Sequence, residues 1–322
     1  MNPRRSPAFL ALLWLVAACG GGTTPSIYGP SSAIGATSAA TSAASLAPTG
    51  TPIPTVPPTR FNGTVTLADG RLLKARCVGE GTPTILLEVG GSGDSGDWQP
   101  QFVNELAATT TTCLYSRAGG SGSTPLGHLP TMAEVTSDAF ELLDLARAKA
   151  GVEGPYLFVG WSLGGSVALG EALTRPDQAV GVAILDTDFP VDFLPFCAAL
   201  GRTKADCQAE FDGDIDARLM ESGIARAVHP LDIPAILITA MDYPDCIDTP
   251  GATFSASISG LILVAGTCAG LATAIADKQV ADWPAAFPKI VQTRVDADHD
   301  GLLRAEGRQI AKLILALVPA AS

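Results

Sequence analysis

The chain has 322 residues, 47% of them hydrophobic, and its 20 Lys and Arg against 32 Asp and Glu give a formal net charge of −12. This apolar content excludes a largely disordered protein. The acidic balance excludes a nucleic-acid binder, which needs basic surface to displace counterions. No stretch reaches the roughly 18 apolar residues that a transmembrane helix requires.

The N-terminus has the pattern of an export signal. Arg4 and Arg5 precede an apolar run over Ala8–Ala18, which suits the core of a signal peptide and is too short to cross a bilayer. The run leads directly into Cys19 and resembles the bacterial lipobox, in which small residues precede a Cys that receives diacylglycerol. The resemblance implies a signal peptide over residues 1–18 and a lipid anchor, which would be the protein's only attachment to the outer face of the cell membrane. The alternative is an ordinary signal peptide in which the Cys has no role.

Residues 19–59 are predicted to be a disordered linker. From residue 20 the segment has no charged side chain and consists mainly of Gly, Ala, Ser, Thr and Pro. Such a composition buries too little apolar surface to offset the entropy lost on ordering. The folded domain is therefore expected over residues 60–322.

Apolar runs alternate with helical patterns along this domain, which predicts an α/β fold with a doubly wound, mostly parallel sheet. The central runs are apolar without alternation, as expected for strands covered on both faces. The expected strands are Gly63–Thr66, Leu72–Val78, Thr84–Val89, Thr112–Ser116, Tyr156–Val159, Gly181–Leu185, Ala235–Thr239 and Ile290–Val295. The expected helices are Trp98–Ala107, Thr131–Ala150, Leu163–Leu173 and Gly307–Leu317. Two segments interrupt the alternation: a lid at about residues 189–232 and a second insertion at about residues 245–288.

A nucleophile is predicted at Ser162. It is the central residue of Gly160-Trp161-Ser162-Leu163-Gly164, a G-x-S-x-G pentapeptide. An expected strand runs into the motif and an expected helix leaves it, which is the context that a strained strand-to-helix turn requires. The alternative is a glycine-rich turn without chemistry.

His299 is the predicted base, because a serine hydroxyl needs a group that takes its proton. The chain has three His residues, and only His299 follows the last expected strand just before the closing helix. His128 and His229 are expected to be surface or packing residues.

The acid that orients this base has three candidates. Asp242 comes soonest after the strand Ala235–Thr239 and is the preferred choice, and Asp245 is close behind it. Asp186 follows the preceding strand, whose end faces the same edge of the sheet. Each of them could instead cap a turn or a helix.

The chain order Ser, acid, His resembles the α/β-hydrolase family, and the resemblance covers nearly all of residues 61–322. Leu86–Gly93 is similar to the family's oxyanion loop, with Val89 in place of the usual His, as in a subgroup whose loop reads Leu-Glu-x-Gly. The resemblance implies that the backbone amides of Gly91 and Leu163 hold the oxyanion.

A second segment, Tyr115–Gly119, resembles the same subgroup's Tyr-Asp-Arg-Ala-Gly, with Ser116 in place of the Asp. Related dehalogenases and epoxide hydrolases have an Asp as nucleophile, so the serine at position 162 disfavours those branches.

The cysteines favour an oxidising compartment. In the sheet of this family the second strand lies beside the fourth, so Cys77 and Cys113 would be neighbours. The other expected pairs are Cys197 with Cys207 and Cys246 with Cys268. A metal site is not expected, because the sequence contains neither C-x-x-C nor H-E-x-x-H.

Together these patterns predict an exported, lipid-anchored serine hydrolase that cleaves carboxylic esters of small molecules through an acyl-enzyme and needs no cofactor. The alternatives are an aminopeptidase or amidase on the same fold, and a catalytically inactive surface-binding lipoprotein.

Overall fold

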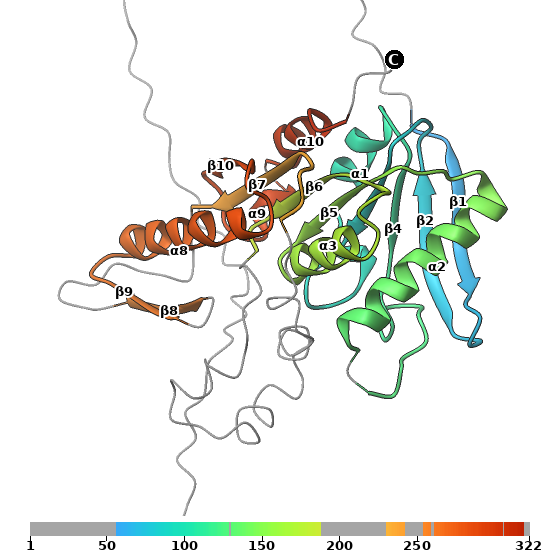
Figure 1. The fold of residues 1–322 in the computed structure, drawn as a ribbon, viewed down its shortest axis with the longest axis horizontal. Helices are drawn as coiled ribbons and strands as arrows, with labels where there is room; N and C mark the ends of the chain where they lie inside the picture. The colour runs from blue at the N-terminus through green and yellow to red at the C-terminus, as the bar shows by residue number, and fades with distance from the viewer. Residues whose placement is uncertain are drawn as a thin grey trace, which may run out of the picture. The chain divides into compact units, whose positions relative to one another are not determined.

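A computed structural model describes residues 56–128, 130–187, 230–241, 254–258, 261–304 and 306–318, all within the compact unit Ile53–Ser322. Eight strands form one sheet in the order β1-β2-β4-β3-β5-β6-β7-β10 (Figure 1). β2 is antiparallel to β1 and to β4, and all other neighbours are parallel. The strands are β1 (Thr59–Thr66), β2 (Leu72–Val78), β3 (Thr84–Glu88), β4 (Thr112–Tyr115), β5 (Tyr156–Trp161), β6 (Ala179–Leu185), β7 (Ala235–Ala240), β8 (Phe254–Ile258), β9 (Leu261–Ala265) and β10 (Val291–Val295).

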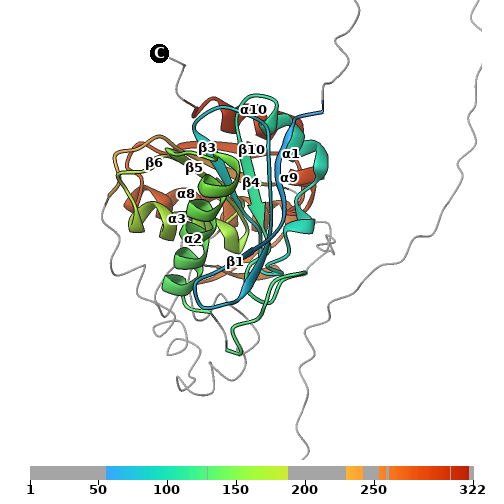
Figure 2. The same ribbon diagram turned by 90° about the vertical axis from the view of Figure 1, so that its right-hand side faces the viewer.

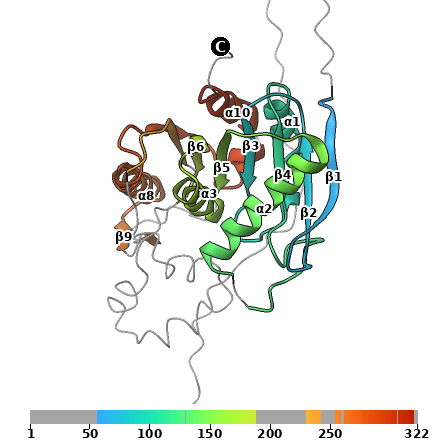
Figure 3. The ribbon, with the colours of Figure 1, turned by 45° about the vertical axis from the view of Figure 1, so that its right-hand side comes forward.

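Helices cover both faces of this sheet. The helices are α1 (Pro100–Ala107), α2 (Met132–Ala150), α3 (Leu163–Thr174), α8 (Cys268–Asp282), α9 (Gly301–Arg304) and α10 (Gly307–Leu315), with 3-10 turns η1 (Ser95–Asp97) and η2 (Trp283–Ala285). α2, α3 and α8 lie on one face, and α1, α9 and α10 lie on the other (Figure 2). α2 and α3 pack side by side (Figure 3). The predicted doubly wound sheet is confirmed.

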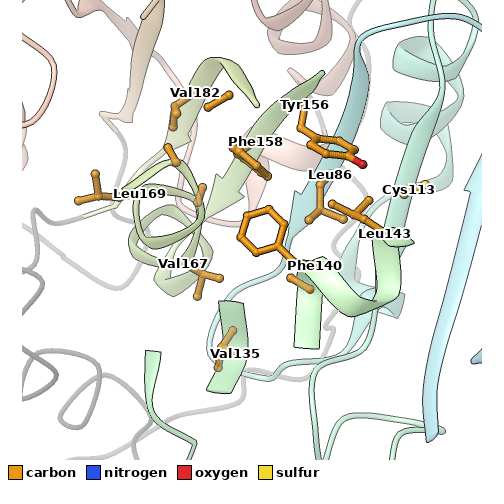
Figure 4. Packing of buried hydrophobic residues seen from close by; sticks show 14 of the residues in the cluster. Leu86, Cys113, Val135, Phe140, Leu143, Tyr156, Phe158, Val167, Leu169 and Val182 are labelled. Atoms are coloured by element: carbon orange, nitrogen blue, oxygen red, sulfur yellow. The ribbon is translucent and has the colours of Figure 1, made fainter. Parts of the chain in front are cut away.

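Two buried apolar clusters, one on each face, hold the layers together. All residues of β3, β4 and β7 are buried, which explains why their sequences lack alternation. On the face covered by α2, the ring of Phe140 meets Phe158 of β5 edge to face at 6.1 Å between centroids (Figure 4).

Local signals explain the helix ends. α2 begins with a capping box, in which the Thr131 hydroxyl accepts the amide hydrogen bond of Glu134 and the Glu134 carboxylate accepts that of Thr131. The helix ends at Ala150 and is capped by Gly151, whose left-handed φ of 61° suits glycine. α1 begins at Pro100 rather than at the expected Trp98, because the residue before a proline is driven out of the helical region.

The second predicted insertion contains structure that the sequence did not specify. β8 and β9 form a separate antiparallel pair, and α8 follows them. The signal segment, the linker up to residue 55 including Cys19, and most of the predicted lid with its two cysteines lie outside the described residues. The last residue of the predicted linker, Thr59, already belongs to β1. In the described ranges no helix has the length and apolar character that crossing a membrane requires.

The predicted neighbours Cys77 and Cys113 form a disulfide between β2 and β4, where they are directly paired, with 4.1 Å between their Cα atoms. Cys268, at the start of α8, is also disulfide-bonded. Its expected partner, Cys246, lies outside the described residues.

Candidate active site

Ser162 occupies a strained turn between β5 and α3. Its backbone angles are φ 54° and ψ −130°, a region that residues with a side chain rarely adopt. The flanking glycines are sterically required: a Cβ on Gly160 would lie 2.0 Å from the carbonyl oxygen of Gly164. A Cβ on Gly164 would lie 2.0 Å from the carbonyl oxygen of Glu88. The G-x-S-x-G pattern is thus the sequence signature of a close approach between this turn and β3.

Residues at the end of β6 hold the Ser162 turn in place through hydrogen bonds. The amide of Ser162 donates to the carbonyl of Leu185 at 2.9 Å, and the Thr187 hydroxyl donates to the carbonyl of Ser162 at 2.6 Å. The same hydroxyl would lie 2.2 Å from a Cβ at Gly165. Thr187, which follows the neighbouring strand β6, therefore fixes the Ser162 backbone. The sequence did not indicate this role.

His299 lies between β10 and α9 and is anchored on two sides. Its Nδ1 is 2.6 Å from an Asp186 carboxylate oxygen. The indole N–H of Trp161, the residue before Ser162, donates to the His299 carbonyl at 3.1 Å, and the two rings lie 5.0 Å apart. A carboxylate on Nδ1 fixes the tautomer, so Nε2 is the ring nitrogen that would exchange protons with a reacting group.

Among the described residues, the acid in contact with His299 is Asp186, one of the three candidates of the sequence analysis. One Asp186 oxygen accepts the backbone amide hydrogen bond of Ala240 at 3.1 Å, and the other faces the imidazole. The Asp186 side chain is only 4% exposed, and its φ of 46° is left-handed. Asp242 and Asp245 lie outside the described residues. Since β6 and β7 end at the same edge, the strand pattern alone did not distinguish these carboxylates.

The described residues contain no hydrogen bond between the Ser162 hydroxyl and the His299 ring. Trp161 nevertheless joins the two segments, because it precedes the serine in the chain and packs on the imidazole. Catalytic hydrogen bonds are often long before substrate binds and shorten in the complex. The arrangement therefore brings a hydroxyl, an imidazole and a carboxylate to one edge of the sheet.

The predicted oxyanion loop passes beside this serine. A Cβ built on Gly90 would lie 3.3 Å from the Cβ of Ser162, whereas one built on Gly91 would meet no atom within 4 Å. Gly91 is exposed and therefore borders open space. Leu163 begins α3, where the backbone amides have no partner within the helix. Both predicted amide donors thus lie close to the nucleophile.

A buried charged cluster lies beneath the loop. Arg117 contacts Glu88 at 3.4 Å, and both side chains are almost fully buried. Glu171 of α3 is buried next to Glu88; burial, and then the Glu88 charge, raise its pKa well above the ordinary range. Burial raises the pKa of Glu88 too, but the Arg117 guanidinium opposes this rise. Of the two carboxyls, Glu88 is therefore the one whose charged form a neighbouring cation favours more strongly.

A pocket of about 230 Å³ borders the site. It is lined by Gly96, Asp97, Gln99, Trp161, Asp300, Leu303 and Arg304. Trp161 and Asp300 are the chain neighbours of the serine and the histidine, and neither Ser162 nor His299 itself lines the pocket. Within the described ranges, no group of three or more His, Cys, Asp or Glu could hold a metal ion.

The chain matches no protein-family model, and no curated protein is similar to it in sequence. Several solved structures share its fold. A protein from Agrobacterium vitis S4 that is assigned as a hydrolase is 18% identical, with a TM-score of 0.57 over 81% of this chain and 100% of that one. Mouse alpha/beta hydrolase domain-containing protein 10 is 15% identical, with a TM-score of 0.55 over 80% and 98%. The enol-lactonase from Burkholderia xenovorans LB400 is 16% identical, with a TM-score of 0.50 over 79% and 98%.

Proposed function

We propose that this chain, which has the α/β-hydrolase fold, is a serine hydrolase that cleaves carboxylic esters through an acyl-enzyme. The observation that carries the proposal is the strained turn at Ser162, set at the same sheet edge as a His299 ring whose Nδ1 is paired with Asp186. Strain of this kind is maintained only where the surrounding structure enforces it, and it concentrates at functional sites. The similarity in fold to proteins described as a hydrolase and an enol-lactonase supports the reaction class.

In the proposed mechanism, the Ser162 oxygen attacks the ester carbonyl carbon while His299 Nε2 takes the hydroxyl proton. The tetrahedral intermediate collapses, its bond to the alkoxy oxygen breaks, and the imidazolium returns the proton to the leaving alcohol. A water molecule then attacks the acyl-enzyme in the same way and releases the acid. Asp186 holds the imidazole in the correct tautomer and stabilises its charged form, as in other serine triads.

The negative oxygen of each tetrahedral intermediate would be held by the backbone amides of Gly91 and Leu163. Removing one such donor costs on the order of 10²–10³ in kcat, so these backbone positions contribute substantially to the rate beside the side chains. The open space around Gly91 is consistent with an amide that faces substrate.

Turnover of p-nitrophenyl esters of increasing acyl length, with matched amides and peptides, tests this proposal. We expect wild type to hydrolyse the esters and Ser162→Ala to lose at least about 10³-fold in kcat, because the acyl-enzyme cannot form. Equal rates for both proteins would favour the inactive binding lipoprotein. Preferential cleavage of peptides or amides would favour the aminopeptidase or amidase.

We further propose that the protein is exported and anchored to the outer face of the membrane through Cys19. The support is the signal-like pattern before Cys19 and the Cys77–Cys113 disulfide, which suits an oxidising compartment. Labelled palmitate fed to producing cells should enter wild type and not Cys19→Ala, and the variant should move to the soluble exported fraction. Equal labelling of both proteins would contradict the anchor.

A further inference from the structure

Arg117 donates hydrogen bonds to the loop that follows β3 from both its side chain and its backbone. One terminal guanidinium nitrogen donates to the carbonyl of Val89 at 2.5 Å, and the other donates to the carbonyl of Gly90. The Arg117 amide donates to the carbonyl of Gly93 at 2.9 Å. The side chain is only 3% exposed, so these contacts are shielded from water. A single residue thus holds three carbonyls of one glycine-rich loop.

Because the peptide bond is planar, these hydrogen bonds also determine the direction of the Gly91 amide. The Gly90 carbonyl and the Gly91 N–H belong to one peptide unit, and in a trans unit they point in opposite directions. A guanidinium that fixes the carbonyl oxygen on one side of the loop therefore directs the N–H to the other side. At Gly90 the loop packs against the Ser162 turn. A Cβ built on Gly90 would lie 3.3 Å from the Cβ of Ser162.

We propose that Arg117 is a positioning residue that sets the direction of the Gly91 N–H in the oxyanion hole. This inference rests on the proposed serine-hydrolase function. The glycines at positions 90, 91 and 93 would otherwise give the loop wide conformational freedom. Oxyanion stabilisation depends on donors that are oriented before the reaction begins, so fixing this peptide unit contributes directly to the rate.

The chemistry of the contact requires an arginine. Its planar fork can donate to two adjacent carbonyls at once, whereas a lysine ammonium is a compact point charge without that geometry. Glu88 supplies the counter-charge at 3.4 Å from the guanidinium. Glu88 also ends β3 and immediately precedes the loop, so the ion pair ties the guanidinium to the strand from which the loop departs.

The test compares Arg117→Lys with Arg71→Met. Lysine keeps a positive charge opposite Glu88 but removes the fork. Arg71 is a matched control, because it is also paired through its fork, with Asp138, and lies in the turn between β1 and β2. A double variant, Arg117→Met with Glu88→Met, removes both buried charges together. It replaces Arg117→Lys in the same measurements if the lysine variant does not fold.

For Arg117→Lys we expect a 10- to 100-fold loss in kcat on an ester with little change in KM, and a parallel loss of affinity for an alkylboronic acid, whose tetrahedral adduct needs the oxyanion hole. Arg71→Met should keep the wild-type kcat and the wild-type affinity for the boronic acid, each measured per folded molecule. A variant whose kcat and boronate affinity both match wild type would overturn the inference, as would a rise in KM alone. Failure of the proposed function is distinguishable, since wild type itself would then show no turnover.

Discussion

Among the described residues, two that are not glycine have a left-handed backbone, and both belong to the candidate site. Ser162 has φ 54° and Asp186 has φ 46°. The two are linked through β6, because the residue before Asp186 accepts the Ser162 amide hydrogen bond. Backbone conformations that cost energy are therefore placed where the candidate nucleophile and the candidate acid project from the sheet edge.

The contact between Asp186 and His299 predicts which carboxylate supports catalysis. Asp186→Asn should lower kcat by about 10⁴, because an amide at Nδ1 favours the wrong tautomer and does not stabilise the imidazolium. Asp242→Asn is the matched control and should stay within a few-fold of wild type. Steady-state kinetics on one ester check both variants. The reverse ranking would assign the role to Asp242.

The candidate nucleophile and the candidate base could be proposed from the sequence because each has a distinctive context. Ser162 is flanked by glycines that the close approach to β3 requires, and His299 alone among three histidines follows the last strand. The acid could not be fixed, because several aspartates follow strands that end at one edge. Arg117 lay in a segment similar to a known motif, but its contacts depend on burial and loop geometry that the sequence does not display.

At the scale of elements, the close contact between the Ser162 turn and β3 predicts a stability effect. Gly164→Ala should lower the free energy of unfolding by about 3 kcal/mol, because its methyl group would lie 2.0 Å from a backbone oxygen that a side-chain rotation cannot clear. Gly63→Ala is the control: in β1 the added methyl would meet only the Phe61 ring at 3.8 Å. Urea unfolding checks the pair, and equal midpoints would contradict the steric account.

The strands of the main sheet were predicted within a few residues, because apolar runs covered on both faces leave a clear signal. α1 started later than expected because Pro100 sets its first turn. α8 and the β8–β9 pair were missed. α8 is rich in small residues and has little amphipathic contrast, and the strands of the hairpin mix small and apolar residues on either side of a Ser-Gly pair. Weak local patterns of this kind acquire their structure from tertiary contacts.

At the scale of the whole molecule, the buried Glu171 makes stability depend on pH. Its pKa is raised well above the ordinary range in the folded chain, chiefly by burial. The folded state therefore keeps a proton that the unfolded chain releases above about pH 4.5. The contribution of Glu171 to the free energy of unfolding is fully present below that pH. It decreases as the pH rises toward the pKa of Glu171 in the folded state, by up to about 1.4 kcal/mol per pH unit.

Glu171→Gln cannot ionise, so its stability relative to wild type should increase steadily from pH 5 to pH 8. Urea unfolding at several pH values measures this difference. The surface variant Glu153→Gln is the control and should show no such trend. A constant difference for Glu171→Gln would mean that the buried carboxyl is already ionised at pH 5.

The central claim is that Ser162 is an activated nucleophile, and covalent labelling tests it most directly. The intact, folded protein is treated with a fluorophosphonate, and the modified residue is located by peptide mass spectrometry in wild type and Ser162→Ala. The proposed mechanism predicts one adduct per wild-type chain, on Ser162, and none on the variant. A folded wild-type protein that stays unlabelled at Ser162, or a variant that labels equally, would contradict it.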